Sequence, residues 1–227
     1  MRQRATTITV LLAVLAPGSI ALAEPRAGRV GVLPDYIHVR RPAGGQGSSG
    51  GRFISDYTIE LQERSPTFRD MLTLLGRMPH VGILLSPRPQ EFLEDNLLGR
   101  TVFRITSGTL VAWMELRVDR LRPSRSVEGI AHEFAHVVEA ACLNTSDSMP
   151  ALQSVLQARA SAANGRSSEG PFETRFPGVI GRTVVHEWTR QDTIGQFAAL
   201  ASSNGLAACL RQLPVAPKPR PTDVDGN

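Results

Sequence analysis

The chain has 227 residues, of which 41% are hydrophobic and 20% charged, with a formal net charge of +4. This composition suits one globular domain with a sizeable core. The basic residues are scattered and are not interleaved with aromatic ones, so we expect no nucleic-acid partner. All of the 25 basic residues except Lys218 are arginines, an excess typical of the codon usage of a GC-rich bacterium.

The first 23 residues have the three parts of a secretory signal peptide. Arg2 and Arg4 form a positive start, and the apolar stretch 8–16 is too short for a permanent membrane span. The tripeptide ALA at 21–23 is a cleavage site of the A-x-A type. We therefore predict an exported protein, periplasmic or secreted, that begins near Glu24 after processing and has no stable membrane insertion.

The remaining chain divides into three predicted parts. Residues 24–52 are expected to be a flexible N-terminal segment that ends in the connector AGGQGSSGG at 43–51, with a short strand suggested over 29–33. The globular domain is predicted to span 53–213. The tail 214–227 is rich in proline and charge and is expected to be disordered.

The domain opens with a helix and a strand. Ser65 is a predicted N-cap and Pro66 suits the first helical position, so a helix is expected from there to about Arg77. The apolar run 80–85 predicts a buried strand, which the Ser-Pro pair at 86–87 is expected to stop.

A hairpin is predicted next. After a short helical turn over 90–98, the segments 101–105 and 110–118 are expected to be strands joined by a turn at 107–108. The second strand alternates in polarity along its length. One of its faces is therefore expected to be buried and the other half exposed.

The segment 129–140, GIAHEFAHVVEA, carries the motif H-E-x-x-H in a helix predicted to begin after Ser126 as N-cap. His132 and His136 lie one turn apart on the same face, so both imidazoles can reach one ion. Glu133 can then take a proton from a metal-bound water. Two ordinary histidines on an amphipathic helix are the alternative interpretation. An apolar stripe for the core lies on the opposite face: Ile130, Phe134, Val137, Val138 and Ala141.

Three further helices are predicted, over 150–162, 172–189 and 193–212. Pro177 fits the second of them only in its first turn. The order of elements predicts an α+β domain, in which a small mixed sheet packs on the His helix and the C-terminal half is mainly helical.

Cys142 and Cys209 are the two cysteines of the chain. In an exported protein an even pair suggests a disulfide, which here would close a loop of about 67 residues. Two small buried thiols that never meet are the alternative. The sequence leaves both possibilities open.

A catalytic zinc ion takes three protein ligands and a water, so the two histidines need a third partner. Glu139 shares their face but lies roughly 10 Å of helix rise from His132, which favours a place beside the ligands over direct binding. Glu173 begins a later helix that can cross the first one, and it is the preferred third ligand. The candidates considered are Glu139, Glu169, Glu173, His186, Glu187 and Asp192.

The segment from Leu110 to Trp188 resembles a group of exported bacterial zincin-like proteins of the gluzincin type. That group combines a strand, an HExxH helix continuing to a Glu, and a later helix that begins F-E-T. The block 65–85 also resembles the group's upstream helix and strand. The resemblance implies a zincin-like fold with a Zn²⁺ site formed by His132, His136 and Glu173. The matching residues are His132, Glu133, His136, Glu139, Phe172, Glu173, Thr174, Gly181, Val184 and Glu187.

The predicted function is that of a zinc metallopeptidase-like hydrolase acting on a peptide or protein substrate. Zinc would polarise the scissile carbonyl, and Glu133 would act as general base and later protonate the leaving amine. The edge of strand 110–118 is expected to align an extended peptide, and His186 and Tyr57 are candidate oxyanion donors. A non-catalytic zinc-binding or interaction protein on a degenerate zincin scaffold is the alternative, and an exported domain without metal is another.

Overall fold

The computed structural model describes residues 33–40, 48–88, 98–117, 123–144, 148–164, 173–190 and 194–211. These residues form four strands and seven helices, which confirms the predicted α+β class. The strands are β1 (Ile37–Val39), β2 (Val81–Arg88), β3 (Gly99–Thr106) and β4 (Thr109–Arg117). The helices are α1 (Ser48–Arg64), α2 (Pro66–Leu75), α3 (Pro123–Leu143), α4 (Met149–Asn164), α5 (Arg175–Arg190), α6 (Phe197–Ser203) and α7 (Ala207–Leu210).

The strands form one mixed sheet in the order β1-β2-β4-β3. β2 pairs in parallel with both β1 and β4, whereas β3 and β4 form an antiparallel hairpin. Ser107 and Gly108 make the predicted turn, and both have positive φ, as the tight turns that suit the twist of a hairpin require. β4 therefore lies inside the sheet and β3 at its edge, so the prediction that strand 110–118 offers a free edge is wrong.

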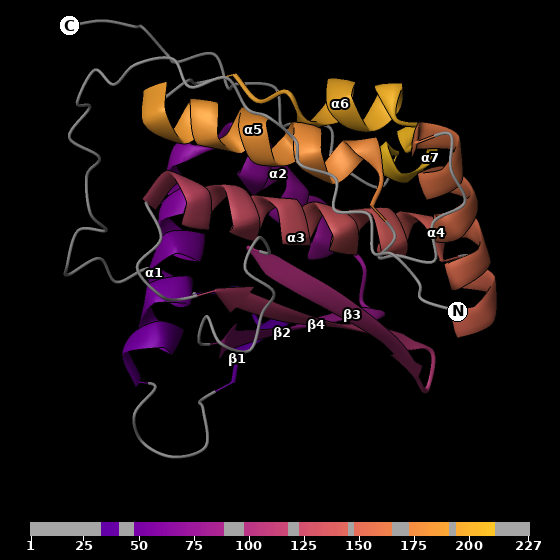
Figure 1. Ribbon diagram of the computed structural model, residues 1–227, viewed down its shortest axis with the longest axis horizontal. Coiled ribbons are helices and arrows are strands. Elements are labelled where there is room, and N and C mark those ends of the chain that lie inside the picture. Colours follow the sequence, from indigo (N-terminus) through magenta and orange to yellow (C-terminus); the bar gives the residue numbers. More distant parts are fainter. Residues whose placement is uncertain are drawn as a thin grey trace, which may run out of the picture.

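Helix α3 lies between the sheet and α5, so its buried residues face two layers (Figure 1). The predicted apolar stripe of α3 is buried, with Phe134 packed edge-to-face on Phe68 of α2 at 5.2 Å between ring centroids. Ala112, Met114 and Leu116 of β4 are also buried, as the alternation of that strand predicts. The core thus forms around α3.

The N-cap predicted for α2 is confirmed, since the Ser65 hydroxyl accepts a hydrogen bond from the Phe68 amide at 3.1 Å. The start predicted for α3 is wrong, because that helix begins at Pro123 and Ser126 lies inside it. Proline suits a first helical position, where the missing N–H has no intrahelical partner. Pro177 likewise falls in the first turn of α5.

The flexible segment predicted over 24–52 contains two ordered elements. β1 adds to the sheet, with Ile37 buried, and α1 begins at Ser48, inside the predicted connector. Ile54, Tyr57 and Leu61 recur at helical spacing and are buried, and this packing stabilises a helix whose glycine-rich start disfavours one. The predicted signal peptide at 1–23, residues 29–32 and the tail 214–227 lie outside the described residues.

β2 continues through the predicted stop at Ser86 and Pro87. The backbone of Ile83 and Leu85 bonds to the β1 side, and alternate residues of a strand point their N–H groups the same way. Position 87 therefore faces the space past the end of β1. Because no residue of β1 lies opposite it there, the missing N–H of Pro87 costs no ladder hydrogen bond.

The single last helix predicted over 193–212 is instead divided into α6 and α7. Gly205 has φ +74, and the Leu206 amide donates to the Ala201 carbonyl at 2.8 Å, a bond typical of a Schellman helix end.

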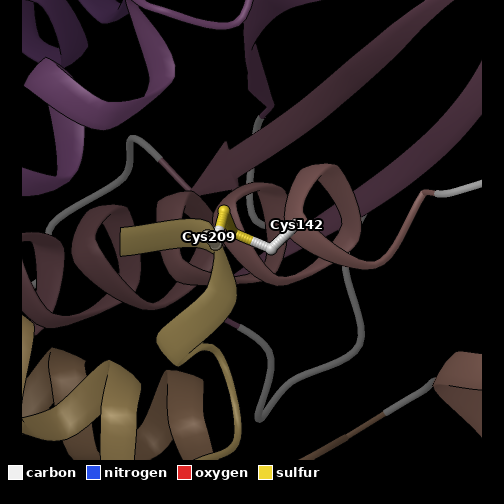
Figure 2. The surroundings of a disulfide bond; sticks show 2 residues. All are labelled: Cys142 and Cys209. Atoms are coloured by element: carbon white, nitrogen blue, oxygen red, sulfur yellow. A yellow bond between two sulfur atoms is a disulfide. The ribbon is translucent and has the colours of Figure 1, made fainter. Parts of the chain in front are cut away.

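A disulfide joins Cys142 of α3 to Cys209 of α7, with an S–S distance of 2.00 Å (Figure 2). Among the described helices, none combines the length and apolar character needed to span a membrane.

Candidate metal centre

Two partly buried imidazoles lie side by side on α3. Because the opposite stripe of the helix is committed to the core, His132 and His136 occupy the face that α5 approaches. Their Nε2 atoms are 3.2 Å apart, and their rings are tilted edge-to-face. The i and i+4 spacing read from the sequence therefore brings both nitrogens to one point.

The Glu173 carboxylate faces both histidines, with one oxygen toward each. Its Oε1 is 3.3 Å from His132 Nε2, and its Oε2 is 3.4 Å from His136 Nε2. Glu173 lies in the non-helical stretch just before α5, and 51% of its side chain is exposed. The three residues form a candidate metal-ligand group, in which one possible ligand atom of each residue lies within 4.8 Å of the others, and Glu173 is its exposed member.

The close approach of α5 to α3 depends on Gly181. A Cβ atom there would lie 3.2 Å from the Glu128 carbonyl oxygen and 3.6 Å from His132 Cβ. A larger residue would push α5 away from the helix that carries both histidines. The glycine therefore helps to place Glu173 beside them.

The charges in this cluster shift the pKa values of its members in opposite directions. Burial alone disfavours charged His132, but the hydrogen bond to Glu173 and the charges of Glu173, Glu133 and Glu128 outweigh it and raise the pKa of His132. Burial also disfavours charged Glu173, yet the hydrogen bonds and positive charges of the two histidines lower the pKa of Glu173 to about 2. The site thus keeps a carboxylate and favours a proton on His132.

The Glu133 carboxylate is held by the sheet. Thr101 of β3 donates from its hydroxyl to Glu133 Oε2 at 2.6 Å. A Cβ atom at Gly99, on the same strand, would lie 2.8 Å from Glu133 Cγ, so only glycine leaves room for this side chain. The edge strand β3 therefore both accommodates and orients the glutamate of the motif.

Glu139 is fully buried and both of its oxygens are hydrogen-bonded. Arg159 Nε of α4 donates to Oε1 at 2.9 Å, and the Thr174 hydroxyl donates to Oε2 at 2.6 Å. Glu139 is therefore not a member of the candidate metal-ligand group. It lies beside that group because it is bonded to Thr174, the residue that follows Glu173.

The other candidates lie elsewhere or outside the described residues. The Glu187 carboxylate is buried against Ser65 and Thr67 at the start of α2, and His186 is exposed on α5. Tyr57 is buried in the core, and its ring centroid is 5.5 Å from that of Phe53. Glu169, Phe172 and Asp192 fall outside the described residues.

Comparison of the chain with models of protein families, with curated proteins and with solved structures finds no match. Two of the residues around the centre, Thr101 and Arg159, carry no signal in the sequence that links them to the motif. Thr174 has a weak one, since it directly follows the preferred third ligand. Sequence reasoning therefore found the donor atoms but missed most of the side chains that hold them.

Proposed function

We propose that the protein is an exported, zinc-dependent hydrolase of the zincin type that cleaves peptide bonds. The observation that carries the proposal is that two imidazole nitrogens 3.2 Å apart face one carboxylate, with Glu173 Oε1 at 3.3 Å from His132 and Oε2 at 3.4 Å from His136. Ligands at 2.0–2.1 Å from a tetrahedral zinc ion are separated by about 3.3 Å. Two imidazoles and a carboxylate are also a donor set used by catalytic zinc, with a position left for water.

His132, His136 and Glu173 would hold the ion, and Glu133 would handle the protons. Bound zinc supplies Lewis-acid catalysis and lowers the pKa of water. Glu133 takes a proton from the attacking water and delivers it to the leaving amine. Because Thr101 occupies Oε2 of Glu133, we assign the proton transfer to Oε1.

The edge strand β3 supports a peptide as substrate. β3 pairs with β4 on one side, and it is the last strand of the described sheet. An extended peptide can add to such an edge through backbone hydrogen bonds. Gly99 and Thr101 of this strand adjoin Glu133, so a peptide bound there would pass close to the proposed base.

The disulfide supports the proposed export. Cys142 and Cys209 are the two cysteines of the chain and are bonded to each other. Disulfides persist in oxidising compartments such as the bacterial periplasm and the extracellular space. A bonded pair fits the signal peptide proposed from the sequence.

A non-catalytic zinc-binding protein is the second candidate. It is favoured by the burial of Glu133, which is only 5% exposed and already accepts a hydrogen bond. A carboxylate held in this way can serve as a fixed structural acceptor. The same residues would then bind zinc without turning over a substrate.

The test combines metal content with peptide hydrolysis in the processed chain, residues 24–227. We expect about one zinc per chain after reconstitution, lost in Glu173→Ala and kept in Glu133→Gln. Turnover of a peptide library by the wild type, abolished in Glu133→Gln, would support the hydrolase. Zinc without turnover would favour the non-catalytic candidate, and a wild type that retains no zinc would overturn both.

A further inference from the structure

The buried carboxylate of Glu139 lies three residues after His136 on α3 and is fully inaccessible to solvent. A buried carboxylate is costly unless its oxygens are hydrogen-bonded and its charge is balanced. Arg159 supplies the balancing charge from α4, and it also donates to the backbone carbonyl of Asn204 at the end of α6. The carboxylate is thus fixed by an arginine that is itself bonded to the end of α6.

The other oxygen of Glu139 fixes the chain that carries Glu173. Thr174 is the next residue, it is buried, and its hydroxyl reaches Glu139 at 2.6 Å. Glu173 itself is half exposed and lies in the non-helical stretch before α5. The Thr174–Glu139 bond ties this stretch to the helix that carries His132 and His136.

We infer that Glu139 and Thr174 are positioning residues for the metal ligand Glu173, with Arg159 holding Glu139 in place. The inference rests on the proposed metal site. The bond holds the backbone of residue 174 against α3, so the Glu173 carboxylate is already beside the imidazoles before an ion binds. Preorganised ligands lose less conformational freedom on binding, and metal affinity rises accordingly.

The experiment measures zinc affinity in the processed chain by competition with a chromophoric chelator. Thr174→Val keeps the volume of the side chain and removes its hydroxyl, and we expect the Kd for zinc to rise by about tenfold or more. Thr174→Ser restores the hydroxyl, so we expect it to bind zinc nearly as tightly as the wild type. Co²⁺ absorption, which is sensitive to coordination, should change in Thr174→Val and recover in Thr174→Ser.

Thr67→Val is the matched control. The Thr67 hydroxyl donates to another buried carboxylate, Glu187, at 2.5 Å, and neither residue belongs to the metal-ligand group. We expect this variant to lose thermal stability while the Kd for zinc stays within twofold of the wild-type value.

Two results would overturn the inference while leaving the zinc site intact. One is an unchanged Kd in Thr174→Val, with zinc still lost in Glu173→Ala. The other is an equal rise in Kd for Thr174→Val and Thr67→Val, because general loosening would then explain both. A wild-type chain that binds no zinc would overturn the metal site itself, and this inference with it.

Discussion

Two fully buried glutamates, Glu187 of α5 and Glu139 of α3, have their charge stabilised by different partners. Glu187, near the C-terminal end of α5, accepts bonds from the Ser65 and Thr67 hydroxyls and from the Thr67 amide. These donors are neutral and sit at the start of α2, where the helix dipole also favours a negative charge. Glu139 of α3 is balanced by Arg159 and bonded to Thr174, which directly precedes the start of α5.

The difference lies in what each carboxylate fixes. Glu187 joins α5 to the cap of α2, and the Thr67 hydroxyl in turn accepts a bond from the Gln196 amide at 2.8 Å. Glu139 instead holds the residue next to Glu173. Roughly 18 Å of helix separates the start of α5 from Glu187, so the two clusters can be altered separately. Burial of a carboxylate therefore does not by itself indicate a function. The function depends on which residues its hydrogen-bond partners hold in place.

Removal of the disulfide should have the largest effect on stability. The disulfide begins at Cys142, three residues after Glu139 on α3. Replacing Cys142 and Cys209 by serine reopens a loop of 67 residues, which we expect to cost roughly 4 kcal/mol of unfolding free energy. Because Cys209 follows closely on Asn204, the acceptor of Arg159, the zinc Kd should also rise. Urea denaturation and chelator competition measure the two effects. An unchanged Kd would show that the disulfide stabilises the fold without supporting the metal site.

Glu187→Ala should destabilise the protein nearly as much without changing its affinity for zinc. It leaves the Ser65 and Thr67 hydroxyls without their acceptor, and we expect a loss of about 3 kcal/mol of unfolding free energy. The zinc Kd of the folded chain should not change. Urea denaturation of the metal-free protein gives the first quantity, and titration at a temperature well below Tm gives the second. A raised Kd would mean that the clusters are coupled along α5.

Arg159→Met should affect both stability and metal binding. It keeps an apolar stem but removes the cation that faces fully buried Glu139, and 27% exposure of the arginine side chain moderates the cost to about 2 kcal/mol. Since Glu139 then loses one of its anchors, we expect a several-fold rise in the zinc Kd. Calorimetry and chelator competition provide the measurements. Loss of stability with full zinc affinity would place Arg159 with the Glu187 cluster as a purely structural residue.

The sequence predicted best what depends on local spacing. The HExxH motif and its apolar stripe predicted α3, the Ser-Pro pair predicted the start of α2, and the Ser-Gly pair predicted the β3–β4 turn. Glu173 was preferred because a later helix can return to the first, and the structure does bring it to His132 and His136.

What the sequence did not show depends on partners distant in the chain. Thr101 meets Glu133 across 32 residues, and Arg159 meets Glu139 across 20. No sequence pattern around a threonine in a strand or an arginine on a helix predicts such a contact. β1 was missed for the same reason, since three residues become a strand only because β2 offers them an edge.

The smallest expected effect is the pH dependence of stability. It should differ between the metal-free chain and the chain with zinc bound. The Glu173 pKa is lowered from 4.5 to about 2, so its contribution to stability is present above pH 4.5 and lost as pH falls towards 2. The His132 pKa is raised above 6.5, so its contribution is present below pH 6.5 and lost as pH rises through the raised value. Their pair therefore stabilises the metal-free fold most between these limits.

Because Glu173 is half exposed, this contribution should stay below about 1 kcal/mol. Zinc reverses the dependence on the histidine, since an imidazole must lose its proton to bind the ion. We expect the rise in Tm caused by zinc to grow from pH 6 to pH 8, and Glu173→Gln to lack the acid limb of the metal-free profile. Scanning calorimetry from about pH 2 to pH 8 measures both, the acid limb below pH 4.5 and the zinc effect above pH 6. A zinc effect independent of pH would show that His132 does not bind the ion, since protonation of a ligand must compete with the metal.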